Sequence, residues 1–160
     1  MATKISDFFT LEDMVRSDKA KEKGVDNTPG DMHRENLEKL CKYVLDPIRR
    51  KWGKTIHINS GYRGPRLNSI VKGSEKSDHC SGCAADISTW DRAENKRLFD
   101  MIRNMPDEIP WGQLINENDY QWIHISLKTS AHSGEVFAIR NGATVKGSMQ
   151  KVLGYCTGDK

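Results

Sequence analysis

The segment from His33 to Trp52 constrains the fold of this 160-residue chain more than any other part of the sequence. Its apolar residues recur at steps of three, four and one, which places them on one face of a helix. They are Leu37, Leu40, Cys41, Val44, Leu45, Ile48 and Trp52. Pro47 lacks a backbone N–H, so we expect a kink or a restart of the helix there. A helix with a single buried stripe needs a second layer of structure to cover it.

The remaining elements are expected in the order helices first, then strands with one inserted helix. Helices are expected over Leu11–Lys23 and Arg66–Val71, and from the capping residue Asp91 to Met105, where Pro106 stops the last one. Strands are expected around Ile56 and Ile58, over Cys83–Ser88, Gly112–Asn116 and Trp122–Leu127, and in a hairpin across Asn141-Gly142. This order predicts an α+β fold with a small, mostly antiparallel sheet flanked by helices, in a single domain over residues 1–160.

Composition and charge exclude several classes of protein. With 36% hydrophobic and 29% charged residues and no long apolar run, the chain is expected to be globular, soluble and without a membrane span. The net charge of +3 is spread among acidic residues, so we expect no nucleic-acid partner. The first residues lack the apolar core of a secretory signal, so we expect synthesis in the cytoplasm. We also expect a monomer.

The stretch "KSDHCSGCAADIS", Lys76–Ser88, contains a histidine, two cysteines and an aspartate. A hydrolytic zinc site uses three protein ligands, usually nitrogen and oxygen donors, and leaves one position for water. His79 precedes the predicted strand, Asp86 lies within it, and His124 lies in a second predicted strand. If the two strands are neighbours, these three side chains can meet at one metal ion.

Two rival interpretations use Cys80 and Cys83, which form a C-x-x-C pair. A zinc ribbon would need a second pair of ligands, and Cys156 stands alone near the C-terminus. A redox pair normally opens a helix, whereas strand-forming residues follow this one. Cys41 lies in the helical stripe and is expected to be a core residue. The thiol interpretations are therefore weaker than the His/Asp site.

Three motifs together resemble a known enzyme family. They are "SGYR" at Ser60–Arg63, "SDHCSGCAAD" at Ser77–Asp86 and "WIH" at Trp122–His124. The sequence resembles the zinc D-Ala-D-Ala carboxypeptidase and L-alanyl-D-glutamate endopeptidase family, whose pattern S-x-H-x(2)-G-x-A-x-D it matches. That family shares its fold with the hedgehog signalling domain. From about Phe8 to Leu127 the chain is similar to the short single-domain members that are common in bacteriophages.

The resemblance implies specific roles for several residues. His79, Asp86 and His124 would be the ligands of one zinc ion, and Arg63 would bind the substrate's carboxylate or polarise the scissile carbonyl. Ser77 would either hydrogen-bond the substrate or cap the turn before His79.

The sequence departs from the family at the position of the catalytic acid. Many members have an acidic residue three positions before the last histidine, and Gln121 stands there in this chain. An amide cannot take up the proton of the attacking water, so another carboxylate must serve as the general base. Glu117, in the segment "QLINE", matches the glutamate that short phage-type members carry in their "QLIxE" segment, so we expect it to be that base, with Asp119 as the second choice.

The resemblance implies a zinc peptidase that hydrolyses the D-residue-containing stem peptides of bacterial peptidoglycan, as a carboxypeptidase or an endopeptidase. It would be a phage or prophage lysis enzyme, or a related cell-wall enzyme, that reaches the wall after release or delivery. Because of Gln121, a non-catalytic zinc domain that binds a peptide or partner is the alternative. A thiol redox protein, resting on Cys80 and Cys83 alone, is the third.

Overall fold

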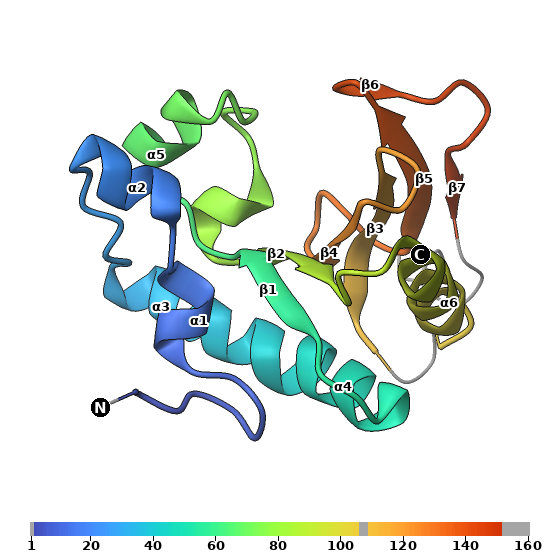
Figure 1. Ribbon diagram of the computed structural model, residues 1–160, viewed down its shortest axis with the longest axis horizontal. Helices are drawn as coiled ribbons and strands as arrows, with labels where there is room; N and C mark the ends of the chain where they lie inside the picture. The colour runs from blue at the N-terminus through green and yellow to red at the C-terminus, as the bar shows by residue number, and fades with distance from the viewer. Residues whose placement is uncertain (1, 106–108, 152–160) are drawn as a thin grey trace.

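Helices precede and flank one mixed sheet in the computed structural model, which describes residues 2–105 and 109–151 (Figure 1). The helices are α1 Leu11–Val15, α2 Asp18–Lys23, α3 Asp31–Leu40, α4 Asp46–Trp52, α5 Pro65–Ile70 and α6 Arg92–Arg103. The strands are β1 His57–Ser60, β2 Ala84–Ser88, β3 Trp111–Glu117, β4 Trp122–Leu127, β5 Glu135–Arg140, β6 Ala143–Thr144 and β7 Gln150–Lys151. The predicted α+β class is confirmed. Pro106 and Cys156 lie outside the described residues.

The described strands form a sheet in the order β1-β2-β4-β3-β5-β6, with β7 also pairing with β5. Every pairing is antiparallel except that of β3 with β5, so the sheet is mostly antiparallel, as predicted. Strands β2 and β4 are neighbours, and their register sets Asp86 opposite His124. This pairing meets the condition that the predicted metal site required.

The long N-terminal helix is continuous but changes its winding before Pro47. Helices α3 and α4 are joined by a π-helical turn over Cys41–Leu45, in which the Asp46 N–H donates to the Cys41 carbonyl. A proline ring inside a regular α-helix clashes with the carbonyl four residues earlier. The wider turn falls where that clash would occur, and Pro47 then lies in the first turn of α4, where no N–H is needed. The disturbance expected at Pro47 therefore takes the form of a π-helical turn inside a continuous helix.

The predicted apolar stripe forms much of the core. Leu37, Leu40, Cys41, Val44, Leu45 and Ile48 are fully or almost fully buried, and Trp52 packs partly buried against the same cluster. Residues of α6 and of the central strands complete the cluster, with Trp111 the largest fully buried side chain. In Figure 1 the long helix runs beneath β1 while α6 lies beside the strands at the other end. None of the helices in the described part of the chain is long and apolar enough to cross a membrane.

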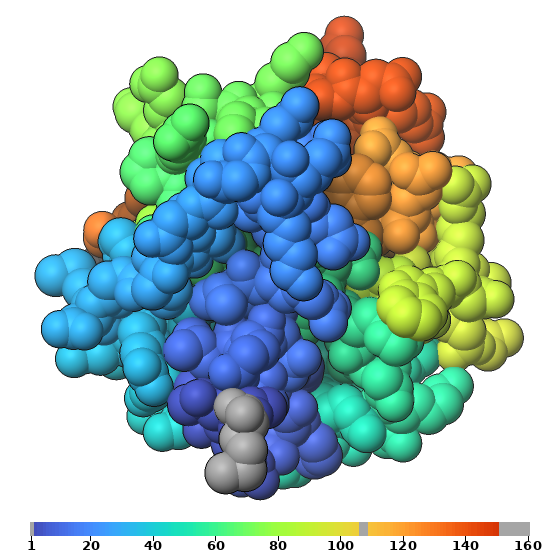
Figure 2. All heavy atoms as spheres, turned by 60° about the vertical axis from the view of Figure 1, so that its left-hand side comes forward, coloured from blue at the N-terminus to red at the C-terminus, as the bar shows by residue number. Residues whose placement is uncertain are grey.

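The expected helix over Leu11–Lys23 is wrong in one respect, because it is two helices. The chain turns out of α1 at Arg16, and the Ser17 side chain accepts from the Ala20 N–H to begin α2. The break leaves the carbonyl of Met14 free to accept from the Tyr62 N–H at 2.7 Å. Figure 2 shows these N-terminal residues, in blue, on the surface beside the green residues that include α5.

Two other local predictions agree with the structure. Asp91 caps α6 by accepting from the Glu94 N–H, although the Glu94 carboxylate contacts Lys54 and Arg97 rather than returning to the cap. The hairpin of β5 and β6 turns at Asn141 and Gly142, whose φ values of 53° and 79° suit a tight two-residue turn.

Candidate metal centre

Three side chains from three elements meet where Asp86 of β2 pairs with His124 of β4. His79 comes from the short 3-10 helix η2, Asp78–Ser81, whereas Asp86 lies in β2 and His124 in β4. One nitrogen or oxygen atom of each lies within 4.8 Å of the other two. His79 Nε2 and His124 Nδ1 are each 3.2 Å from Asp86 Oδ1. Two imidazoles and one carboxylate are a donor set that zinc uses in hydrolytic sites.

The orientation of His79 is fixed by the "SGYR" segment. His79 Nδ1 lies 2.7 Å from the carbonyl oxygen of Gly61, and the ring is only 1% exposed. A carbonyl can only accept, so Nδ1 carries the hydrogen in the neutral ring and Nε2 keeps a lone pair directed at Asp86. The Arg63 N–H also donates to the His79 carbonyl at 3.0 Å. Two hydrogen bonds thus join the two motifs and present His79 Nε2 as a ligand.

The turn that carries His79 is held against α3. The His79 N–H donates to Ser77 Oγ at 3.2 Å, and Asn36 Nδ2 donates to the Ser81 carbonyl at 2.8 Å. Gly82 follows with a φ of 78°, and a Cβ there would lie 2.5 Å from the His33 carbonyl oxygen. Only glycine satisfies both the backbone angle and the close approach. The glycine of the motif is therefore required for the turn to pack.

The charge state of the cluster suits a cation. Burial alone would raise the pKa of Asp86, but the adjacent rings of His79 and His124 outweigh it and hold that pKa well below its ordinary value. The carboxylate is therefore ionised. His124 is also buried, and its Nδ1 lies 3.2 Å from the same Asp86 oxygen that His79 Nε2 approaches. The residues present therefore fit a divalent cation with nitrogen and oxygen ligands.

The three side chains line a cleft of about 710 Å³. Arg63, Ser77 and Glu117 line the same cleft. Arg63 Nη2 is 3.5 Å from Ser77 Oγ, while its Nε is buried without a hydrogen-bond partner in the described part of the chain. A guanidinium with unused donors beside the cluster can bind a carboxylate or a developing negative charge. Of the two roles considered for Ser77, the capping bond to the His79 N–H is present.

Glu117 is the last residue of β3 and pairs with Trp122 at the start of β4. Burial and the negative charge of Asp86 together raise the pKa of Glu117 to about 7, against the opposing effects of His124 and Arg63. A carboxyl group with a pKa close to neutrality can both accept and release a proton. Among the carboxylates that line the cleft, the pKa of Asp86 is thus lowered and that of Glu117 is raised.

The structure does not bring Asp119 or Gln121 into the cleft. Both are exposed in the β3–β4 turn, and neither lines the cleft. Asn118, Asp119 and Tyr120 all have positive φ, and the Tyr120 N–H donates to Asn116 Oδ1 at 2.6 Å. The turn thus bends away after Glu117. Of the two acids considered as the base, Glu117 alone lies beside the cluster.

The cysteines of the opening motif have the properties of packing residues. Cys83 is buried and Cys80 partly buried, and both are free thiols. Burial raises the pKa of both thiols, whereas a reactive thiol needs a lowered pKa. Cys41 is fully buried in the core, as predicted, and burial raises its thiol pKa strongly.

Sequence reasoning missed Asn27, which supports the "SGYR" segment. Its Nδ2 donates to the carbonyls of Val15 and Tyr62 at 2.9 and 3.0 Å, and its Oδ1 accepts from the Gly64 N–H at 2.8 Å. The sequence signal was a loop asparagine before a threonine and a proline, which indicates only a turn. Asn27 instead holds the backbone on both sides of Arg63.

Sequence reasoning also missed a second polar group on the cleft wall. His132 lies with its Nδ1 3.2 Å from Glu135 Oε2 and its Nε2 4.0 Å from Asp78 Oδ2. Gln113 Nε2 donates to the same Glu135 oxygen at 3.0 Å. Asp78, Gln113 and His132 all line the cleft. A lone histidine in a loop gave no signal of this contact.

Comparison with known proteins agrees with this geometry. Residues 7–126 match the family described as Peptidase M15. The matched stretch covers well over half of the chain and includes Arg63, Glu117 and all three members of the cluster. No curated protein matches the chain.

Proposed function

Because the chain belongs to the peptidase M15 family, we propose that it is a zinc-dependent peptidase that hydrolyses the stem peptides of bacterial peptidoglycan. The observation that carries this proposal is the His79–Asp86–His124 cluster in one cleft with Glu117 and Arg63. The cluster offers the metal ligands, and the two further residues offer a base and an anion-binding group.

We assign zinc to His79 Nε2, an oxygen of Asp86 and His124 Nδ1. The assignment is supported by the hydrogen bond of His79 Nδ1 to Gly61, which leaves Nε2 as the ligand atom. It is also supported by the 3.2 Å approach of both imidazoles to the same carboxylate oxygen. When bound at such a site, zinc acts as a Lewis acid and lowers the pKa of water toward neutrality.

Glu117 is the general base in this proposal. It takes a proton from the attacking water and later delivers it to the amine that leaves. Its half-buried carboxyl and its raised pKa support both steps, because the group can change protonation state near neutral pH. The proposal does not use Gln121 or Asp119, which lie in the exposed turn.

Arg63 stabilises negative charge on the substrate, either the carbonyl oxygen that is attacked or a terminal carboxylate. Its support is the buried Nε without a partner and the Nη2 close to Ser77. The backbone bond from Arg63 to His79 keeps the guanidinium in register with the cluster.

The substrate and the biological setting rest on the sequence motifs. The S-x-H-x(2)-G-x-A-x-D pattern is similar to that of enzymes that cut D-Ala-D-Ala or L-Ala-D-Glu bonds. We therefore extend the proposal to a single monomeric domain over residues 1–160, from a phage or prophage lysis system or a related cell-wall pathway. Such an enzyme acts on the wall after release or delivery.

Digestion of purified peptidoglycan tests the proposal. The zinc-loaded protein should release new peptide ends, a chelator should stop the release, and added zinc should restore it. Free D-alanine would identify a carboxypeptidase, whereas new L-alanine and D-glutamate ends would identify an endopeptidase. If the zinc-loaded protein binds stem peptides but cuts none, the non-catalytic zinc domain is the correct interpretation.

A further inference from the structure

Trp90 is exposed in a way that the fold does not need. It follows β2, its side chain is 75% exposed, and its φ is 68°. Bulky residues rarely adopt this left-handed backbone angle, and surrounding structure must hold them there. Strained residues of this kind are concentrated at functional sites, so an exposed indole in this conformation indicates a functional role.

The strained backbone is held by buried polar residues. The Trp90 N–H donates to Ser88 Oγ at 2.8 Å, and Asn95 Nδ2 donates to the same oxygen at 3.2 Å. The Thr89 N–H donates to Asn95 Oδ1 at 2.8 Å. Ser88 and Asn95 are almost fully buried. The backbone that carries the indole is therefore fixed from inside the molecule.

The indole is also held flat. Its ring stacks on the ring of His57 from β1, with centroids 3.4 Å apart and planes 3° apart. Because His57 covers one face, the exposed area of Trp90 includes the opposite face. This arrangement is a rigid aromatic platform presented to solvent.

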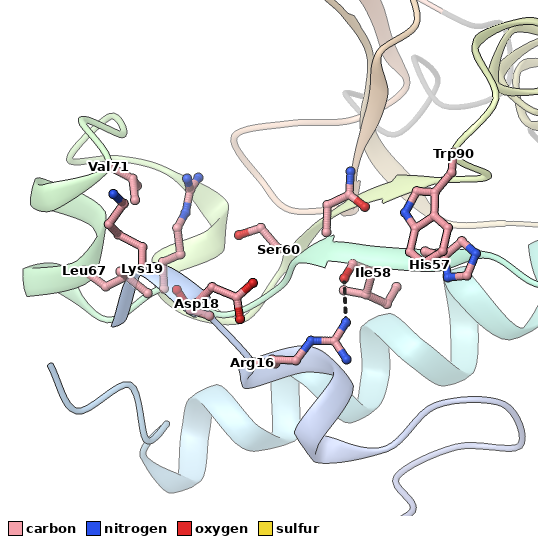
Figure 3. Close-up of a pocket in the computed structure, with 12 residues that line it drawn as sticks. Arg16, Asp18, Lys19, His57, Ile58, Ser60, Leu67, Val71 and Trp90 are labelled. Atoms are coloured by element: carbon pink, nitrogen blue, oxygen red, sulfur yellow. Dashed lines mark hydrogen bonds between the residues drawn. The ribbon is translucent and has the colours of Figure 1, made fainter. Parts of the chain in front are cut away.

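The platform ends a groove of about 500 Å³ along β1. In Figure 3, Trp90 and His57 lie at one end of this groove, Leu67 and Val71 at the other, and Ile58 and Ser60 between them. Arg63 lines both this groove and the cleft of the metal centre. The groove and the cleft therefore meet at Arg63, which we propose stabilises negative charge on the substrate. His57 and Ser60 are about 10 Å apart along the strand, at about 3.3 Å per residue.

The chemistry of the groove suits a sugar joined to an anionic peptide. A pyranose ring has an apolar C–H face that packs on a flat aromatic ring, and polar substituents at its edge. Arg16, Lys19 and Arg63 line the groove against one acid, Asp18. The edge of β1 is partly closed to a pairing peptide strand, because Arg16 Nη2 contacts the Ile58 carbonyl at 3.5 Å. Stacking is therefore favoured over strand addition.

We propose that Trp90, stacked on His57, is a binding subsite for the N-acetylated sugar that carries the stem peptide. This inference rests on the proposed function and adds a second recognition element to it. The substrate peptide lies in the metal cleft and continues past Arg63, and the sugar packs on the free face of Trp90. The enzyme would then prefer glycan-linked stems over free peptides.

The experiment compares two substrates, a disaccharide pentapeptide and the same pentapeptide without sugar. The ratio of their kcat/KM values should favour the sugar-bearing substrate in the zinc-loaded wild type. Trp90→Ala should lower this ratio about tenfold, mostly through KM, which corresponds to about 1.4 kcal/mol. Trp90→Phe should keep most of the preference. Tyr43→Ala is the matched control, because Tyr43 is an exposed aromatic residue in the long helix and lines neither hollow, and it should keep the wild-type ratio.

An unchanged ratio in folded, zinc-loaded Trp90→Ala would overturn the inference, as would an equal loss on both substrates. If no peptide is cut, a direct binding titration with the disaccharide that lacks the peptide still tests the inference. Wild type should bind the disaccharide at least tenfold more tightly than Trp90→Ala. Absence of hydrolysis with this difference intact would defeat the proposed function alone, and equal binding by the two proteins would defeat the subsite.

Discussion

The metal cleft and the groove along β1 meet at Arg63 but are built differently. In the cleft, His79 and His124 are buried, and the hydrogen bond of His79 Nδ1 to the Gly61 carbonyl fixes Nε2 as the ligand atom of His79. In the groove, Trp90 is exposed, and its backbone rather than its indole is fixed by buried groups. The difference indicates that the cleft requires exact donor chemistry, whereas the groove adds affinity by shape. Substitutions in the cleft should therefore abolish activity, and substitutions in the groove should only reduce it.

The largest effect is expected for His124→Ala. Removing one of three ligands should abolish tight zinc binding and hydrolysis together, because two remaining ligands hold the ion poorly. Metal content by atomic absorption and peptide release measure the two losses. Cys80→Ser is the comparison variant and should keep both. Zinc that survives in His124→Ala but is lost in Cys80→Ser would mean that the cysteines bind the metal.

Glu117→Gln should have the next largest effect. The amide keeps the shape of the side chain but cannot accept a proton, so kcat should fall by about 10²–10⁴ with zinc retained. Asp119→Asn, in the exposed turn that follows, should change kcat little. A large loss in Asp119→Asn and a small one in Glu117→Gln would show that the turn closes over the cleft in the active enzyme.

Glu117 should also affect the stability of the zinc-free protein. Its folded pKa of about 7 lies above the ordinary value of 4.5, so the fold binds its proton more tightly than the unfolded chain does. The resulting stability is present below pH 4.5 and is lost as the pH rises through about 7. Above that pH, Glu117→Gln should be more stable than wild type by about 1–2 kcal/mol, allowing for solvent screening of a half-buried group. Urea unfolding of both proteins at pH 5 and pH 8 measures the difference, and equal pH profiles would refute the raised pKa.

The smallest effect in the cleft region is expected for the cysteines. Cys80→Ser with Cys83→Ala should keep hydrolysis within about tenfold, because neither thiol is activated and Cys83 serves as a small buried group. Kinetics of the double variant, with circular dichroism as the check on folding, provide the measurement. Complete loss of activity in a folded protein would favour a role for the thiols.

The sequence predicted the cleft better than the groove, for physical reasons. Strand alternation predicted the faces on which Asp86 and His124 lie, and the pairing of β2 with β4, which the sequence left as a condition, sets them opposite each other. The long helix was visible because its buried stripe is periodic. Glu117 was chosen from its resemblance to the glutamate in the "QLIxE" segment of short phage-type members, and it lies in the cleft.

The features that escaped prediction depend on contacts between distant segments. Ser17 caps a second helix inside a helix-forming stretch and so breaks the stretch in two. The reason for the break is seen only in the hydrogen bond from the Tyr62 N–H to the Met14 carbonyl. The platform needs His57 and Trp90 in register and a left-handed backbone at Trp90. No local pattern encodes that combination.

The metal environment tests the central claim most directly. X-ray absorption at the zinc edge, on protein loaded with one equivalent of zinc, reports the atoms around the ion and their distances. The account predicts nitrogen and oxygen neighbours at about 2.0–2.2 Å, with no sulfur, and loss of the two-histidine signal in His124→Ala. A sulfur shell at about 2.3 Å would place the zinc on Cys80 and Cys83 and contradict the account.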